Sequence, residues 1–408
     1  MNKMIRLCLL LLCAGFLLVV FKIVGSVIYH NIFAISYEHS QRNSQIANEY
    51  IKKTIERNSH FPSFDVAEFT WNAEHSKNNF KYYNAFVMIG LLKCNDYYEF
   101  VKNYYNDLLL SDGTVNSINN SKNKAKELEA DTILIYYPMY KLKSENKKYS
   151  KAIETAYNNI PKLGKLEKCG NNYRHKVNND KWAYWQFGLD GLYSIYPFLA
   201  KHNTDDENYK NIFERMDWVA NNMILDNGLY SHGATKDGKL NNIVWLRGVG
   251  WYVLAQMELL DIIKDEKYAK PMKKQLARFF DGMIKYQDYK TGMWKNVVYP
   301  NIFKCNRMET SGSLMMSYAL VDAYTKGYVT DKKYFYAGLR AFNGVMDYNY
   351  DKKNGILGNI YRTSNVKNTP EEYCDCKEYV YDEAKGFAAL ILSAHAIDNA
   401  LKNDWRKD

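Results

Sequence analysis

Proline is scarce in this chain, with seven residues in a length of 408. Because proline interrupts helix interiors, its scarcity is compatible with long helices. Hydrophobic residues make up 47% of the sequence and charged residues 25%, which is typical of a globular protein and excludes a disordered one. A chain of this length forms one large domain or two to three ordinary ones.

A dense block of Lys and Arg is also missing, although the formal net charge is +10. The lysines are spread beyond short stretches such as 141–151, so a nucleic-acid partner has little support, whereas an acidic small substrate is compatible with the charge. The sequence has no phosphate-cradling glycine loop and no His/Cys cluster at ligand spacing. We therefore expect no cofactor and no bound metal.

Cysteines are few and irregularly placed. Two of the seven lie near the N-terminus, and the others are Cys94, Cys169, Cys305, Cys374 and Cys376. An odd, scattered set does not form a disulfide framework, and Cys374 and Cys376 are too close for a standard zinc half-site. We expect mostly free thiols.

The N-terminus resembles an export segment. Lys3 and Arg6 precede an apolar run at 7–21, which continues past Lys22 to Tyr29. A basic start before a long apolar run is typical of a signal peptide or signal anchor, and about 20 apolar residues span a bilayer. The sequence predicts a signal anchor or signal peptide at 1–36, with an uncleaved anchor favoured. The body, 37–408, is then expected outside the cytoplasm, secreted or attached to the membrane.

Aromatic residues are abundant, at 15% with 36 Tyr and 8 Trp. Flat side chains with a polar handle suit stacking on sugar rings or bases, although compositional bias also contributes. One acid, Asp190, lies in an aromatic, helix-like run at 186–199. A carboxylate among such side chains loses solvation, so we expect a raised pKa and a proton held near neutral pH. The alternative is a helix acid that points to solvent or caps a turn.

A repeat of about sixty residues runs through the body. Turn signals begin at Asp226, Asp288 and Asp351, which are 62 and 63 residues apart, and an earlier turn lies at 111–115. Between these turns lie pairs of amphipathic segments, with apolar residues at three-to-four-residue spacing. The pairs are 244–264 with 271–286, and 312–326 with 333–349.

A helical hairpin cannot bury its apolar face alone, so the repeats must stack. The 372 residues of the body hold six such hairpins, which predicts an all-α (α/α)6 barrel. An open solenoid used for protein binding is the competing architecture. The unequal loops, which carry Trp, His and Arg, favour the barrel.

Four segments in order, 186–200, 245–252, 286–294 and 309–313, resemble the unsaturated glucuronyl and rhamnogalacturonyl hydrolases of glycoside hydrolase families 88 and 105. The resemblance covers roughly residues 75–395 and implies the same (α/α)6 barrel. It implies substrates with a 4,5-unsaturated uronic acid at the non-reducing end, most closely of rhamnogalacturonan type. The vinyl ether is protonated at C4 and hydrated at C5, and the hemiketal opens and expels the remaining sugars.

By position in the family pattern, Asp190 is the implied catalytic acid, whose conjugate base then activates water. Asp131 is the implied second carboxylate, with Glu129 close behind. The implied substrate-binding residues are His175, His232, Trp245, Arg247 and Trp251, with Arg247 suited to a bidentate carboxylate contact and the indoles to stacking. The segment 309–313 is expected to open a helix, with Ser or Thr as its cap and Gly312 permitting close packing.

The chain departs from the family pattern near Asp190. Gly188 stands where the family commonly has Trp, and Gly233 to Thr235 replace a Trp-Asp pair after His232. Two other functions are therefore considered: a different (α/α)6 carbohydrate enzyme, such as a sugar epimerase, and a catalytically silent glycan-binding protein.

Overall fold

The computed structural model describes residues 37–57, 82–94, 96–114, 129–175 and 185–402, and these are mostly helical. The longer helices are 37–57, α3 (Tyr82–Lys93), α4 (Tyr98–Leu108), α7 (Lys147–Asn159), α8 (Asp190–His202), α9 (Asp206–Asn222), α10 (Leu246–Ile262), α11 (Glu266–Ile284), α12 (Thr310–Thr325), α13 (Lys332–Gly344) and α14 (Ala384–Lys402). Two single-turn helices, α5 (Ala130–Ile133) and α6 (Met139–Leu142), flank the 3₁₀ turn η2 (Leu134–Tyr136).

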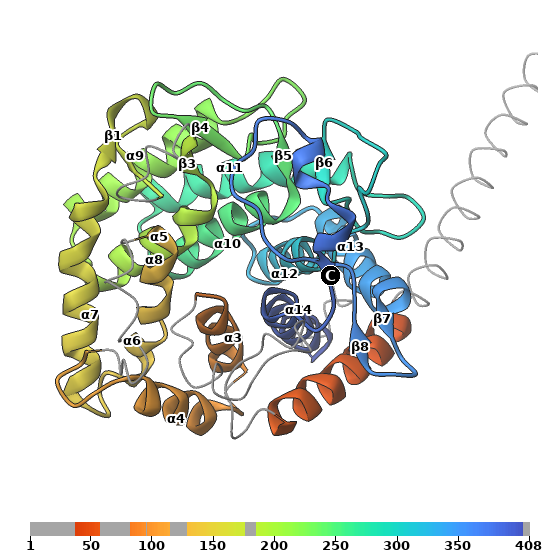
Figure 1. Cartoon of the computed structure of the whole chain (residues 1–408), viewed down its shortest axis with the longest axis horizontal. Helices are drawn as coiled ribbons and strands as arrows, with labels where there is room; N and C mark the ends of the chain where they lie inside the picture. The colour runs from red at the N-terminus through yellow and green to blue at the C-terminus, as the bar shows by residue number, and fades with distance from the viewer. Residues whose placement is uncertain (1–36, 58–81, 95, 115–128, 176–184, 403–408) are drawn as a thin grey trace, which may run out of the picture.

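The helices form two layers (Figure 1). The inner layer consists of α3, α8, α10, α12 and α14, whose side chains are almost all buried. Neighbouring inner helices pack on one another: α8 on α10, α10 on α12, α12 on α14 and α14 on α3, while α5 packs on α8 and η2 on α3. The amphipathic helices α4, α7, α9, α11 and α13 lie outside them, with one buried face each.

The predicted turns are present between the described helices. Gly113, Gly228, Gly292 and Gly355 follow the predicted aspartates and have φ between 66° and 84°, a left-handed conformation that glycine adopts without strain. A side chain at Gly228 has room, but at Gly292 an added Cβ comes within 2.4 Å of the Arg340 carbonyl oxygen. Close packing of the turn on α13 therefore adds to the need for glycine at position 292.

Two sequence-based boundaries are wrong. Helix α11 begins at Glu266, because Asp265 caps it by accepting from the Lys267 amide, and Pro271 lies inside the helix. The run at 186–199 is not helical throughout: β3 (Trp185–Gly188) ends just before α8 begins at Asp190. Pairing with a distant strand overrides the local pattern there.

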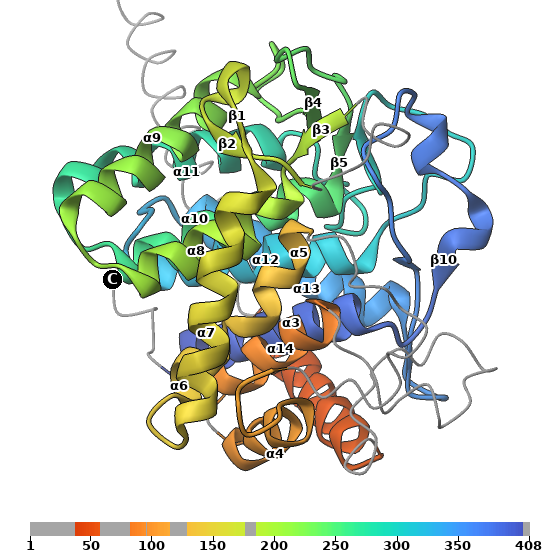
Figure 2. The ribbon, with the colours of Figure 1, turned by 60° about the vertical axis from the view of Figure 1, so that its left-hand side comes forward.

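Within the described residues the strands form five two-stranded antiparallel sheets. β1 (Lys165–Leu166) pairs with β2 (Asn172–Tyr173), β3 with β4 (Gly233–Thr235), β5 (Val244–Trp245) with β6 (Val297–Tyr299), β7 (Tyr350–Asp351) with β8 (Ile356–Leu357), and β9 (Ile360–Tyr361) with β10 (Tyr379–Val380). Figure 2 shows β1 to β5 near one another, above α8 and α10 and away from α4 and α6.

Cys305 and Cys376 form a disulfide bond, with their Cα atoms 5.1 Å apart. The expectation of free thiols is wrong for this pair and holds for Cys94, Cys169 and Cys374. Spacing in sequence could not reveal the pair, because 71 residues separate its members. The bond joins the loop after β6 to the segment between β9 and β10.

The predicted N-terminal anchor at 1–36 lies outside the described residues. Among residues that the structure describes, no helix is both long and apolar enough to cross a bilayer.

A partly buried ion pair joins α10 to α3. Lys93 Nζ lies 3.0 Å from Glu258 Oε2, and the Tyr137 hydroxyl donates to Glu258 Oε1 at 2.6 Å. Burial acts to raise the pKa of Glu258, but the charge of Lys93 and the hydrogen bonds outweigh it and lower this pKa to about 2. Since a buried charge needs its partner, the pair fixes one inner helix against another.

We predict that Glu258→Gln lowers the free energy of unfolding at pH 7 by about 2 kcal/mol, because Lys93 loses the nearer of its two carboxylates and keeps only Asp261, whose Oδ2 is 3.8 Å away. The folded-state pKa of Glu258 is depressed. Its contribution to the free energy of unfolding is therefore complete at pH values above the ordinary glutamate pKa, and it is lost as pH falls toward about 2. Urea unfolding at pH 7 and at pH 3 tests both statements. A loss of stability at pH 3 as large as that at pH 7 contradicts the assignment.

Candidate active site

Asp190 is the first residue of α8, and the pairing of β3 with β4 places His232 beside it. Gly188 is opposite Gly233 in this ladder, and the Leu189 amide donates to the His232 carbonyl oxygen at 3.1 Å. His232 Nε2 then lies 2.7 Å from Asp190 Oδ2. The His232 side chain is fully buried, whereas that of Asp190 keeps 18% exposure. His232 therefore fixes the Asp190 carboxylate from the buried side, and the remaining side of the carboxylate is open to solvent.

The pKa of Asp190 lies below its ordinary value. Burial acts to raise it, but the interaction with His232 outweighs burial, and His175 and Arg247 act in the same direction as His232. The expectation of a raised pKa is wrong for this structure. Desolvation is present as predicted, but a histidine 42 residues later compensates it.

Asp131 and His175 form a second carboxylate–histidine pair next to the first. The Ala130 amide donates to the His175 carbonyl oxygen at 2.8 Å, and His175 Nε2 lies 3.5 Å from Asp131 Oδ2. Gly191, the second residue of α8, permits this approach, since an added Cβ there comes within 3.1 Å of the Ala130 Cβ and 3.5 Å of His175 Nδ1. We call Asp131, His175, Asp190 and His232 the carboxylate–histidine cluster.

Tyr82, at the start of α3, faces this cluster. Its pKa is raised by burial and by the charges of Asp131, Glu383 and Asp190, against the opposing charge of Arg247. Groups from four separate segments therefore act on one phenol. The sequence did not single out Tyr82, because a tyrosine opening a helix is unremarkable in a chain with 36 of them.

The two predicted stacking indoles are buried. Trp245 is 1% exposed: its ring lies 4.8 Å from that of His232, and its Nε1 donates to Asn296 Oδ1 at 2.9 Å. Trp251 is 4% exposed and stacks on Tyr193, with ring centroids 5.7 Å apart. The structure therefore places both indoles behind the cluster as support, and neither presents an open face to a sugar in this conformation.

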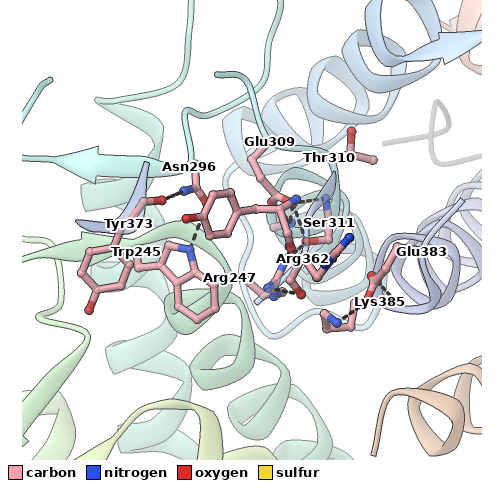
Figure 3. A network of polar contacts seen from close by, with 12 residues as sticks. Trp245, Arg247, Asn296, Glu309, Thr310, Ser311, Arg362, Tyr373, Glu383 and Lys385 are labelled. Carbon is pink, nitrogen blue, oxygen red and sulfur yellow. Dashed lines mark hydrogen bonds and ion pairs between the residues drawn. The ribbon is translucent and has the colours of Figure 1, made fainter. Parts of the chain in front are cut away.

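Arg247 is also buried, with 1% exposure, and its guanidinium serves the protein itself (Figure 3). Nη1 donates to Ser311 Oγ at 3.1 Å and to the Tyr361 carbonyl oxygen, and Nη2 donates to the Arg362 carbonyl oxygen at 3.2 Å. Its cationic carbon lies 4.7 Å from the Trp245 ring. A direct contact with a substrate carboxylate stays a prediction. It would use the N–H groups of Arg247 that these hydrogen bonds do not occupy.

The segment 309–313 opens α12 as expected, but the cap is Glu309. This buried carboxylate accepts from the amides of Ser311 at 3.1 Å and Gly312 at 2.7 Å, and also from the Tyr361 amide. A carboxylate at a helix N-terminus satisfies free amides and faces the positive end of the helix dipole. The close packing expected at Gly312 is present, since an added Cβ comes within 2.4 Å of Leu246 Cγ.

Val366 lies next to Gly188 and Gly233, the two glycines near Asp190 at which the chain departs from the family pattern. An added Cβ at Gly233 comes within 2.6 Å of both Val366 γ-carbons, and one at Gly188 comes within 3.4 Å of Val366 Cγ2. The same position at Gly188 is 3.5 Å from Asp190 Oδ2. Glycine at 233 therefore makes room for a valine from the segment between β9 and β10, while a Cβ at 188 would be in ordinary contact with it.

Other residues near the cluster were missed from sequence because they lie far along the chain. Tyr373 places its hydroxyl 2.7 Å from His232 Nδ1. Glu383 and Lys385 form a buried ion pair before and within α14, and the Lys385 ammonium lies 5.9 Å from the Tyr82 ring centroid. A buried pair two residues apart looks in sequence like an ordinary solvated turn.

Among solved structures, a family 105 glycoside hydrolase from C. acetobutylicum ATCC 824 is 19% identical with a TM-score of 0.71, over 86% of this chain and 99% of that one. The unsaturated glucuronyl hydrolase from Bacillus sp. GL1 is 11% identical with a TM-score of 0.62, over 91% and 97%. Protein Atu3128 of Agrobacterium fabrum is 26% identical over 188 residues, which are 41% of this chain and 80% of that protein.

The solved structures are too distant in sequence to show more than a shared fold. The family comparison goes further, because the Glycosyl Hydrolase Family 88 model matches residues 50–399. This range includes every residue of the carboxylate–histidine cluster. The protein is therefore a glycoside hydrolase that belongs to Glycosyl Hydrolase Family 88.

Proposed function

We propose that this enzyme removes a 4,5-unsaturated uronic acid from the non-reducing end of lyase-generated oligosaccharides, of rhamnogalacturonan type. The observation that carries the proposal is the pairing of Asp190 with His232 at 2.7 Å, next to Asp131 and His175. Family membership supports it, as does the similarity in fold to an unsaturated glucuronyl hydrolase. Another structure of similar fold is named with the saccharide dGlcA-Glc-Rha-Glc, and has a TM-score of 0.62.

In the proposed reaction Asp190 transfers a proton to C4 of the vinyl ether, and the electron pair of the C4–C5 double bond forms the new C–H bond. Water adds at C5, and its proton returns to the Asp190 carboxylate. The resulting hemiketal opens and releases the remaining sugar chain. No glycosyl-enzyme forms, so the rule that links carboxylate separation to stereochemistry does not apply.

The other members of the cluster have distinct tasks in this scheme. Asp131, paired with His175, orients the sugar or the attacking water on the second side of the ring. His232 holds Asp190 in place, and the guanidinium of Arg247 contributes positive charge for an anionic substrate. We further propose that the two helix layers are the six hairpins of a closed (α/α)6 barrel.

We predict that Asp190→Asn lowers kcat by on the order of 100- to 10,000-fold, because the amide keeps the shape but cannot donate the proton. The assay follows the loss of ultraviolet absorbance of the conjugated double bond in lyase digests. The wild-type reaction in heavy water is expected to place deuterium at C4. Near wild-type turnover of the variant, or no deuterium at C4, overturns the mechanism.

Asp237→Asn is a matched control, since Asp237 is exposed in the turn after β4. It makes the same change of side chain close to His232 in sequence and is expected to keep full activity. Digests of rhamnogalacturonan, glycosaminoglycan and ulvan identify the preferred sugar. A protein that binds these digests but leaves their absorbance intact is the silent glycan-binding alternative, and conversion of a sugar without loss of a double bond indicates an epimerase.

We also propose that the body works outside the cytoplasm, held by or released from the segment 1–36. The disulfide Cys305–Cys376 supports this, because disulfides persist in oxidising compartments. Fractionation of the full-length protein tests it, with accessibility of the body to protease added outside the cell as the measurement. Unprocessed protein in the soluble cytoplasm contradicts the proposal.

A further inference from the structure

Tyr373 lies behind His232 and makes more contacts than a structural tyrosine needs. It ends the 3₁₀ turn η6 (Glu371–Tyr373), is fully buried, and has its hydroxyl 2.7 Å from His232 Nδ1. The same oxygen accepts from the Lys367 amide at 2.9 Å and from Asn241 Nδ2 at 3.1 Å. Three groups therefore converge on one phenol oxygen.

The hydrogen inventory settles which way the contact to His232 runs. A tyrosine hydroxyl has one proton to donate and two lone pairs that accept. Lys367 N–H and Asn241 Nδ2–H are donors without acceptor capacity, so they occupy the lone pairs. The single proton of Tyr373 is left for His232 Nδ1, which must then be unprotonated and accept it.

A neutral imidazole with an unprotonated Nδ1 carries its proton on Nε2. That nitrogen faces Asp190 Oδ2, so the histidine donates to the carboxylate. We infer that Tyr373 is a positioning residue of the proposed reaction: it fixes the Nε2–H tautomer of His232 and so aims a hydrogen bond at Asp190. The kinetic part of this inference rests on the proposed function, whereas the tautomer itself does not.

The surroundings keep this arrangement from changing. Burial raises the pKa of the Tyr373 hydroxyl far above its ordinary value, so the proton is present at any working pH. The His232 ring lies against the backbone of α10, where an added Cβ at Gly248 comes within 2.5 Å of His232 Cδ2. Trp245 covers the ring from another side. The charged or titratable groups that face Asp190 are His232, His175, Arg247, Tyr82 and Tyr373.

The tautomer is tested directly by ¹⁵N NMR of wild-type protein labelled at histidine, with the His232 signals assigned by their loss in His232→Gln. The expected result is a protonated Nε2 and an unprotonated Nδ1 across neutral pH. A proton on Nδ1 in the wild type overturns the inference, whether or not the protein turns over any substrate.

Tyr373→Phe removes the donor and keeps the ring. We expect the preference of His232 for the Nε2–H tautomer to be lost, kcat to fall roughly 10- to 100-fold as for other residues that orient a catalytic group, and KM to change little. The alkaline limb of the kcat profile is expected at higher pH, since the Asp190 carboxylate loses a hydrogen bond that stabilises it. An unshifted profile together with an unchanged His232 tautomer overturns the inference.

Tyr379→Phe is the matched control. The Tyr379 hydroxyl also anchors the segment between β9 and β10, by accepting from the Arg307 amide at 3.1 Å, but it does not contact His232. If loss of any anchoring hydroxyl in this segment causes the kinetic effect, both variants show it. The inference requires that only Tyr373→Phe changes the pH profile.

Val366 supports a second proposal on an independent observation, the absence of space for a side chain at Gly233. Its two γ-carbons occupy that space, each 2.6 Å from the position that a Cβ on Gly233 would take. Methyl groups cannot solvate a charged substituent, and such a group placed against them loses its hydration. We propose that Val366 determines specificity at the proposed active site and selects a sugar without sulfate beside the unsaturated uronate.

The test compares kcat/KM for two unsaturated disaccharides, one with an unsulfated and one with a sulfated sugar after the uronate. Wild-type enzyme is expected to prefer the first. Val366→Ala removes two methyl groups and is expected to reduce that preference about tenfold, the effect of small changes in an apolar contact. An unchanged ratio overturns the role of Val366, and wild-type enzyme that turns over neither these disaccharides nor a rhamnogalacturonan digest contradicts the proposed function instead.

Discussion

A buried guanidinium at Arg247 is the constraint on which the arrangement of the site depends. A charge in the interior is stable only when partners compensate it. Glu309 Oε1 lies 3.7 Å from Arg247 Nη1, and the carbonyl oxygens of Tyr361 and Arg362 accept hydrogen bonds from the guanidinium. These partners belong to the start of α12 and to β9. The pair therefore joins the N-terminal ends of two inner helices to the beginning of the segment that carries Tyr373.

That segment, which lies between β9 and β10, is fixed at several further points. The disulfide Cys305–Cys376 ties it to the loop after β6, and Asn296 Nδ2 donates to the Tyr373 carbonyl oxygen at 2.7 Å. Asn241 Nδ2 also donates to the Lys367 carbonyl oxygen at 3.1 Å. Because each anchor comes from a different part of the chain, a short irregular segment can hold a hydroxyl within hydrogen-bonding distance of His232.

The family pattern assigned Asp190 and His232 to one active site but did not pair them with each other. The sequence itself predicted the helical class and the repeat turns. Those features are local: a glycine turn or an apolar spacing is complete within a few residues. It could not predict that β3 precedes Asp190, because β4 supplies the partner strand, or that Cys305 pairs with Cys376. Trp245 and Arg247 were expected to face a sugar, since sequence reveals residue type and not the direction in which a side chain points.

The lowered pKa of Asp190 is compatible with an acid in the proposed reaction, because the substrate itself is charged. In the free enzyme His232 keeps the carboxylate ionised, and the helix N-terminus of α8 adds to that stabilisation. A uronate brought next to Asp190 adds a second negative charge and displaces water, and both effects raise the pKa of the acid. The proton thus arrives with the substrate, and the hydrogen bond from neutral His232 then stabilises the carboxylate that remains after transfer to C4.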